Sequence, residues 1–153
     1  LGWIYPAFFV PQNISEAVIK GLELQASTVI SGIYFDGQFS WIDPENTDGG
    51  IHDGNVLARR AEQTFTFNMN KSFGDFSVAS QVFVSGRRFD DAANSRKISG
   101  FTTVDLSGRY KINKDLTASL KLANLFNEEY ETVSGFNTDG TTIFFSLNYQ
   151  PTH

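Results

Sequence analysis

The sequence lacks cysteine, has only four prolines among its 153 residues, and contains no long apolar run. The absence of cysteine excludes disulfide frameworks, thiolate zinc sites and cysteine nucleophiles. The longest apolar stretch, from Trp3 to Val10, is interrupted by Pro6 and is much shorter than the roughly 18 residues of a membrane-spanning helix. Basic residues are also few. A formal net charge of −5, without a basic cluster longer than two arginines, argues against a nucleic-acid partner.

Aromatic residues are abundant, with 15 Phe, 5 Tyr and 2 Trp. The mean hydropathy is nevertheless slightly negative, because Gly, Asn, Ser and Thr are also common. Membrane β-barrels combine an apolar outer face with a polar interior, so their average hydropathy need not resemble that of a helical membrane protein. The composition therefore permits a membrane protein built of strands.

Period-two alternation of apolar and polar residues is the dominant pattern and predicts an all-β fold. Between residues 32 and 41, for example, Ile33, Phe35 and Phe39 alternate with Tyr34 and Asp36. The least regular strand is the first, because Pro6 would remove a hydrogen-bond donor from it. We expect eight strands, at about residues 2–9, 18–30, 32–41, 62–70, 76–85, 102–112, 116–125 and 142–150.

The connections alternate between short and long. Those after the second, fourth and sixth expected strands are tight turns, whereas those after the third, fifth and seventh run roughly over residues 43–57, 86–100 and 127–141. Outer-membrane barrels show this asymmetry, with periplasmic turns and longer extracellular loops. Aromatic residues near the strand ends would form interfacial girdles: Trp41, Phe73, Phe89, Phe101, Tyr110 and Tyr149.

The pattern thus predicts an antiparallel up-and-down transmembrane β-barrel in the bacterial outer membrane. A soluble β-sandwich with aromatics at its rim, a small closed eight-stranded structural or adhesion barrel, and a soluble lipid-binding barrel are the alternatives. Charged residues of the polar faces are explained by ion pairing inside the lumen, where they avoid lipid, and need no substrate. They are Glu23, Asp36, Asp105, Arg109, Lys111 and Lys121.

Catalytic and metal sites are not expected. His52 and His153 lie in a loop and at the terminus, without the serine or carboxylate spacing of a triad, so we expect surface histidines and no enzyme. The segment from Asp43 to Asp53 carries four carboxylates that could hold calcium. Its spacing differs from an EF-hand, and an ordinary acidic surface loop is the preferred interpretation.

Three runs resemble motifs of TonB-dependent outer-membrane receptors. Residues 13–24, NISEAVIKGLEL, resemble "N-x-x-x-A-x-x-x-G-x-E", and residues 57–61, LARRA, resemble "L-P-R-R-A". Residues 122–132, LANLFNEEYET, are similar to "N-L-F-D-x-x-Y". The resemblance implies that residues 1–153 form the C-terminal part of a larger barrel of about 22 strands, its last eight strands, without the N-terminal plug domain. A start at Leu1 without an initiator methionine fits a fragment or a processed chain.

Two further runs narrow the resemblance to cobalamin (vitamin B12) receptors. Residues 130–140, YETVSGFNTDG, resemble "Y-E-T-x-x-G-Y-x-T-x-G-R", and residues 86–94, GRRFDDAAN, resemble "G-x-R-Y-D-D". The sequence departs from these patterns at Ala58, Phe136 and Thr141, where Pro, Tyr and Arg are usual. The implied function is a part of a transporter for active cobalamin uptake, with a siderophore receptor as the alternative.

The resemblance also implies partners and ligand contacts. The partners are outer-membrane lipid, the rest of the barrel, the plug domain, and the TonB complex through the absent N-terminal part. Cobalamin is the transported ligand, and no cofactor is implied. Arg59 matches an arginine that reaches the bound corrinoid, and Phe136 matches a tyrosine that packs on it. The alternatives are a girdle arginine that pairs with lipid headgroups and a loop-packing phenylalanine without the tyrosine hydroxyl.

Overall fold

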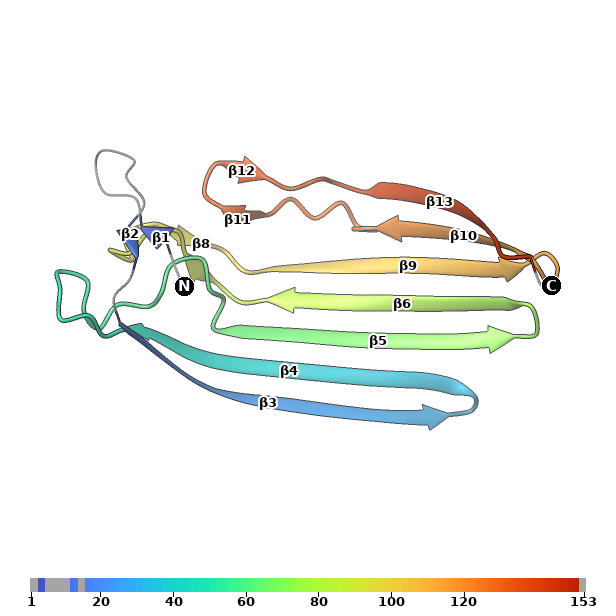
Figure 1. The fold of residues 1–153 in the computed structure, drawn as a ribbon, viewed down its shortest axis with the longest axis horizontal. Coiled ribbons are helices and arrows are strands. Elements are labelled where there is room, and N and C mark those ends of the chain that lie inside the picture. Colours follow the sequence, from blue (N-terminus) through green and yellow to red (C-terminus); the bar gives the residue numbers. More distant parts are fainter. Residues whose placement is uncertain (1–2, 5–11, 14–15, 152–153) are drawn as a thin grey trace.

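The computed structural model describes residues 3–4, 12–13 and 16–151, which form strands and loops. A single seven-stranded sheet dominates, in the order β13-β10-β9-β6-β5-β4-β3, and each neighbouring pair is antiparallel (Figure 1). Its strands are β3 (Ala17–Ile30), β4 (Ile33–Asn46), β5 (Gln63–Phe73), β6 (Phe76–Ser85), β9 (Phe101–Lys111), β10 (Leu116–Ala123) and β13 (Thr142–Tyr149). The expected antiparallel up-and-down order is confirmed.

Three small two-stranded sheets lie outside the main sheet. They are β1 (Trp3–Ile4) with β2 (Gln12–Asn13), β7 (Arg88–Phe89) with β8 (Lys97–Ile98), and β11 (Glu131–Val133) with β12 (Phe136–Asn137). The first expected strand, at residues 2–9, lies outside the described residues except for Trp3–Ile4, which pairs with β2. Seven of the eight expected strands therefore form the sheet in the described part of the chain.

Tight turns close one end of the sheet and long loops project from the other, as expected (Figure 1). Ser31 and Gly32 both have positive φ, 53° and 73°, which is the geometry of a two-residue type I′ hairpin turn. The side-chain Oδ1 of Asn113 accepts the backbone N–H groups of Asp115 and Leu116, each at 2.9 Å. Local side chains thus define the short turns, and residues 47–62, 86–100 and 124–141 form the long connections.

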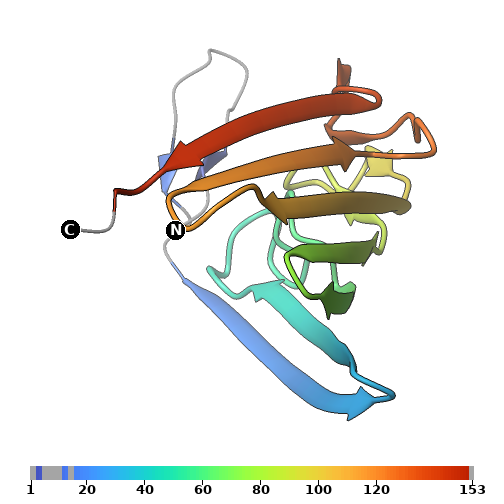
Figure 2. The same ribbon diagram turned by 90° about the vertical axis from the view of Figure 1, so that its right-hand side faces the viewer.

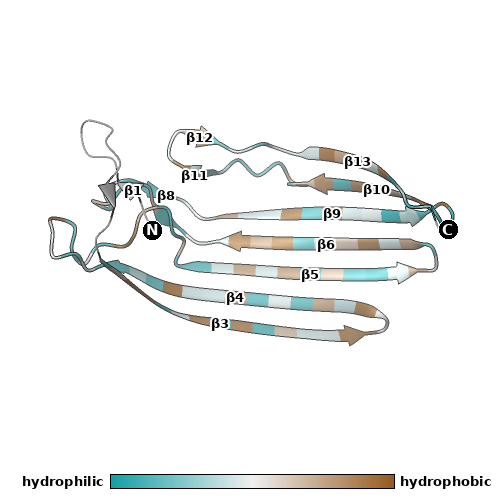
Figure 3. Cartoon of the chain, in the orientation of Figure 1, coloured by the Kyte–Doolittle hydropathy of each residue, from teal (hydrophilic) through white to brown (hydrophobic). Residues whose placement is uncertain are grey.

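The register places apolar and polar residues on opposite faces of the sheet. Phe39 pairs with Leu24 on one side and Phe65 on the other, whereas Asp36 pairs with Ser27 and Asn68. Brown and teal residues alternate along the strands in Figure 3. The side chain of Leu24 is 57% exposed, so the apolar face has no protein cover within the described residues. This face has the character of a barrel surface in contact with lipid.

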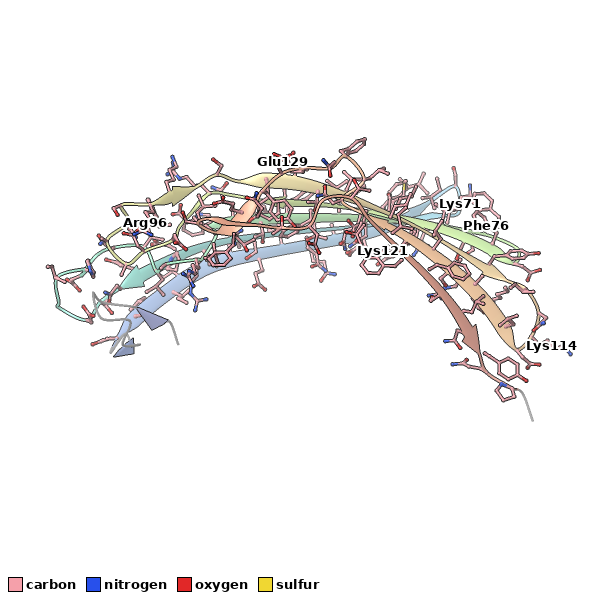
Figure 4. All side chains as sticks on the ribbon, turned by 90° about the horizontal axis from the view of Figure 1, so that it is seen from above. Lys71, Phe76, Arg96, Lys114, Lys121 and Glu129 are labelled. Atoms are coloured by element: carbon pink, nitrogen blue, oxygen red, sulfur yellow. The ribbon has the colours of Figure 1, made fainter. Side chains whose placement is uncertain are left out.

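The sheet is curved into an open arc (Figure 2). Seen from above, it forms an arch, with Lys121 on the concave side and Lys71 and Phe76 on the convex side (Figure 4). The concave face is therefore the polar one. The strand order is linear, and β3 and β13 are its two edges, so the described strands form part of a barrel wall. They do not adopt the alternative of a small closed barrel.

Strand β4 extends further than expected, through Pro44 to Asn46. The backbone N–H of Ile42 donates to the Glu62 carbonyl (2.8 Å), on the side away from β3. Because alternate residues of a strand face the same neighbour, the missing N–H of Pro44 also lies on this side and costs the pairing with β3 nothing. Asp43, expected at the start of an acidic loop, is therefore a strand residue paired with Lys20.

Candidate functional site

The loops 47–62 and 86–100 are joined into one unit by asparagine side chains. The Oδ1 of Asn94 accepts the backbone N–H of Val56, and its Nδ2 donates to the Val56 carbonyl, both at 2.9 Å. The Nδ2 of Asn55 donates to the carbonyl of Ala92, also at 2.9 Å. Asn94 has a φ of 56°, a left-handed conformation that asparagine tolerates better than most residues. These bonds connect positions almost 40 residues apart in sequence.

Arg59 lies at the same junction. Its backbone N–H donates to the Phe89 carbonyl (2.6 Å), and its Nε lies 2.9 Å from Oδ1 of Asp90. The Arg59 side chain is 48% exposed, whereas that of Asp90 is only 8% exposed. The two terminal nitrogens of Arg59 make no hydrogen bond with the described residues. Asp90 thus orients the guanidinium and leaves its outer edge available to an external acceptor.

Asp91 holds the tip of the loop 86–100 together. Its carboxylate accepts hydrogen bonds from Ser95 Oγ (2.7 Å) and from the backbone N–H groups of Arg96 (2.8 Å) and Ser95 (3.3 Å). Partial burial by itself would raise the pKa of Asp91, but these bonds favour the charged form and together lower the pKa below its ordinary value. The charged carboxylate therefore stabilises the turn.

An aromatic cluster joins this loop to residues 124–141. Phe101 is 7% exposed and stacks on Tyr130 with a centroid distance of 3.8 Å, while Phe83 lies 5.9 Å away. The Arg88 guanidinium lies 5.8 Å from the Phe101 ring centroid and donates to Ser85 Oγ (2.6 Å), and burial lowers the pKa of Arg88. The expectation that Phe101 belongs to an interfacial girdle is wrong, because Phe101 lies on the concave face, where Tyr130 of the third long loop covers it.

The other expected girdle residues of the sheet are exposed near the strand ends. On the apolar face, Trp41 is 40%, Phe73 55%, Tyr110 52% and Tyr149 68% exposed. Phe89 is half-buried in β7, outside the main sheet. Aromatic rings at the ends of an exposed apolar face suit the two interfaces of a bilayer.

Asn124 organises the third long loop. Its Oδ1 accepts the Glu128 N–H (2.9 Å), and its Nδ2 donates to the carbonyls of Glu128 (2.9 Å) and Asp139 (3.3 Å). The backbone N–H of Asn124 donates to Oδ1 of Asp105 (3.0 Å), and Thr141 Oγ1 donates to the Asn124 carbonyl (2.8 Å). Asn124 is 6% exposed. The "N-L-F" motif therefore ties both ends of the loop to strand β9.

The two ligand contacts expected from sequence are not brought together. Phe136 lies in the β11–β12 hairpin of the third loop and is 71% exposed. No hydrogen bond, ion pair or ring contact joins it to Arg59 within the described part of the chain. Each of their loops contacts residues 86–100, through Asn94 and Asp90 in one case and through the contact of β11 with β8 in the other. Both residues thus lie at the long-loop end, on different loops.

A row of polar side chains crosses the concave face. The carboxylate oxygens of Asp36 accept hydrogen bonds from the amides of Gln25 and Asn68, each at 3.2 Å, and Gln81 donates to Asn68 (2.9 Å). Further along, Lys121 pairs with Oδ2 of Asp105 at 2.7 Å. The expected ion pairing on the polar face is confirmed for this last pair. Sequence analysis missed that Asp105 also holds Asn124, because period-two alternation carries no information on loop contacts.

The acidic segment around His52 is a self-capped turn. Asp48 accepts the Gly50 N–H (2.8 Å) and Asp53 accepts the Gly49 N–H (3.0 Å). Among residues 3–4, 12–13 and 16–151, no three acidic or histidine side chains lie close enough to hold a metal ion. His153 is outside the described residues. No helix long and apolar enough to cross a membrane occurs in the part of the chain that the structure describes.

The chain is similar to a known protein family. Residues 2–125 match the family model "TonB dependent receptor-like, beta-barrel". The chain belongs to this family of outer-membrane receptors. It is 26% identical over 142 residues to the vitamin B12 transporter BtuB of Photobacterium profundum, and 29% identical over 147 residues to that of Vibrio vulnificus. Each match covers 93% of the chain but 23% of the relative, so the chain spans about a quarter of their length.

Several solved structures share the fold. The siderophore receptor PiuA from Acinetobacter baumannii matches with a TM-score of 0.76 and 19% identity, over 96% of this chain and 24% of PiuA. The ferric citrate transporter FecA matches with a TM-score of 0.80 and 16% identity, over 87% of this chain and 24% of FecA. These matches confirm the fold: the sheet is part of a β-barrel wall.

Proposed function

We propose that this chain forms part of the wall of an outer-membrane transporter that takes up cobalamin. The observation that carries the proposal is the similarity of 93% of the chain to two vitamin B12 transporters, including the loops as well as the strands. The two-faced sheet suits this role, with an apolar convex face toward lipid and a polar concave face toward a lumen. We propose binding and passage of the ligand, without a catalytic step.

The proposal requires further protein around the sheet. The edge strands β3 and β13 leave backbone groups unpaired within the described residues, and such edges are not stable in lipid. We propose that these strands are the C-terminal part of a larger wall, whose other strands pair with both edges. A plug domain inside the lumen and a TonB contact elsewhere in the full-length chain would supply gating and energy.

Arg59 and Phe136 are the proposed ligand contacts. The free outer edge of the Arg59 guanidinium and the 71% exposed ring of Phe136 support this assignment. In the full-length receptor, we expect Arg59→Ala to weaken binding of cyanocobalamin by about 10-fold, which is typical of the loss of a charge-assisted hydrogen bond.

Asp90→Asn is the matched control for Arg59→Ala, because it weakens the pair with Arg59 (2.9 Å) but retains the guanidinium. A direct ligand contact predicts that Arg59→Ala has the larger effect. Equal losses for both variants would show that Arg59 acts only by holding the loops together.

Titration of purified full-length receptor with cyanocobalamin and with a ferric siderophore tests the function itself. Saturable binding of cyanocobalamin alone is expected. Binding of the siderophore alone would replace the proposal by a siderophore receptor, a function that several solved structures of this fold carry in their names.

A further inference from the structure

The third long loop and the polar face of the wall together line an open hollow at the long-loop end of the sheet. The hollow measures about 550 Å³. Its floor consists of wall residues that include Thr103, Asp105 and Phe144, and its rim consists of loop residues that include Tyr130, Asn137 and Asp139. Thr103 and Asp105 share a face with Gln81 and Phe83 of the neighbouring strand, so the floor belongs to the polar, lumen side of the wall.

The β12 strand presents different residues to its two sides. Successive residues of a strand point in opposite directions. Asn137 lines the hollow, whereas its neighbour Phe136 does not line it and is 71% exposed. The residue that this loop directs toward the lumen is therefore Asn137, next to the residue that the sequence motif singles out.

The hollow offers hydrogen-bond acceptors without a compensating cation. The side chains of Asn137, Asp139 and Thr103 make no hydrogen bond or ion pair within the described residues, and no lysine or arginine lines the hollow. Asp105, in contrast, already accepts bonds from Lys121 and Asn124. Asp139 is thus the residue with an unpaired charge among those that line the hollow.

The walls of the hollow are held in place before a ligand arrives. Thr138 Oγ1 donates to the Tyr130 carbonyl (2.9 Å), and the Asp139 carbonyl accepts a bond from Asn124 Nδ2 (3.3 Å). The Tyr130 ring is stacked on the buried Phe101 ring. Residues between these anchors lose little conformational freedom on binding, which favours affinity.

We propose that this hollow is a subsite for hydrogen-bond-donating groups on the ligand, in particular primary carboxamides. The inference rests on the proposed function, since the corrin ring of cobalamin carries primary carboxamides along its edge. An amide N–H₂ would donate to Asp139 or to the Asn137 carbonyl oxygen, and Thr103 can donate to the amide oxygen. A carboxylate group in the same position would meet the charge of Asp139 and would be rejected.

The test uses the full-length receptor and two probes: cyanocobalamin, and its monocarboxylate isomers, in each of which one carboxamide is hydrolysed. We expect Asn137→Ala and Asp139→Asn each to weaken cyanocobalamin binding by about 3- to 10-fold, through the loss or weakening of one hydrogen bond. Wild type should reject at least one monocarboxylate isomer, and Asp139→Asn should restore binding of that isomer. Glu129→Gln removes the same charge from the same loop outside the hollow and should change neither affinity (Figure 4).

The possible results distinguish failure of the proposed subsite from failure of the proposed function. If wild type binds cyanocobalamin, but both hollow variants behave like Glu129→Gln toward all probes, the subsite is disproved and the proposed function stands. If wild type does not bind cyanocobalamin, both fail together. Because neither Asn137 nor Asp139 uses its side chain to hold the loop, both variants should fold, and their heat-dependent mobility in gels should match that of wild type.

Discussion

Replacing Asn124 by alanine should release the third long loop from the wall. The change removes three side-chain hydrogen bonds, two at 2.9 Å to Glu128 and one at 3.3 Å to Asp139. At about 0.5–1.5 kcal/mol for each bond, their loss lowers the free energy of local opening by roughly 2–4 kcal/mol. Alanine also has to adopt the φ of 50° at this position, which costs about 1 kcal/mol more.

Hydrogen exchange measured by mass spectrometry on the full-length receptor in detergent checks this magnitude. Since about 1.4 kcal/mol corresponds to a factor of ten, the amides of residues 127–141 should exchange at least roughly 30 times faster in Asn124→Ala. Asn124→Gly loses the same hydrogen bonds, but glycine adopts a positive φ without the cost of about 1 kcal/mol. The amides of residues 127–141 should therefore exchange about fivefold more slowly in Asn124→Gly than in Asn124→Ala.

Asn70→Ala is the matched control, because this exposed asparagine of β5 makes no hydrogen bond with its side chain within the described residues. Its loop exchange should equal that of wild type. Exchange of residues 127–141 in Asn124→Ala within about twofold of wild type would refute the conclusion that Asn124 anchors the loop, since even one lost bond predicts a larger change.

Three further predictions concern the wall and the second loop. Asp105→Ala should reduce the free energy of unfolding by about 1–3 kcal/mol, because Asp105 pairs with Lys121 and also accepts a loop amide. Lys121→Met should cost less than about 1 kcal/mol, because the Lys121 side chain is 49% exposed. Equal losses for both variants in denaturant titrations would contradict the conclusion that Asp105 holds the loop as well as Lys121. Gly100→Ala places a Cβ 2.5 Å from the backbone oxygen of Ser85 and should lower the free energy of unfolding by about 1–3 kcal/mol in the same titration. Gly37→Ala is the control, because its Cβ would meet only an ordinary 3.8 Å contact with Phe67, and it should be near neutral. The lowered pKa of Asp91 means that its stabilising effect is present above its ordinary value of 3.8 and is lost as the pH falls through the lower folded value. Pepsin cleavage beside Phe89, relative to cleavage of a denatured substrate at the same pH, should therefore increase over that range. Asp91→Ala should abolish this pH dependence.

Local chemistry explains why so much of the sheet was predictable. The alternation around Phe39, the turn at Ser31 and Gly32, and the asparagine at position 113 each act over a few neighbouring residues. The predicted strand ends at residue 41, whereas β4 continues through Pro44 to Asn46. Pro44 is tolerated there because its missing N–H points away from β3, a fact that depends on which strand lies on each side.

The functional end of the molecule depended on contacts that no local pattern contains. Sequence motifs selected Arg59 and Phe136 but could not show that Asp90 orients the first or that the second is absent from the lining of the hollow. The partner of Val56, Asn94, is 38 residues distant. Such pairs form when the loops pack against each other, and the polar residues of these loops could be paired in many other ways without any change of sequence.

The sequence by itself determined the two faces of the wall and the division into tight turns and long loops, because strand periodicity and turn geometry are properties of adjacent residues. Only the tertiary structure decided that the third loop packs against the concave face at Phe101 and that Asn137 and Asp139 line the hollow there. The reason is physical: the position of this loop follows from Asn124 bonded to Asp105 and Tyr130 stacked on Phe101, contacts that exist only after the strands have paired.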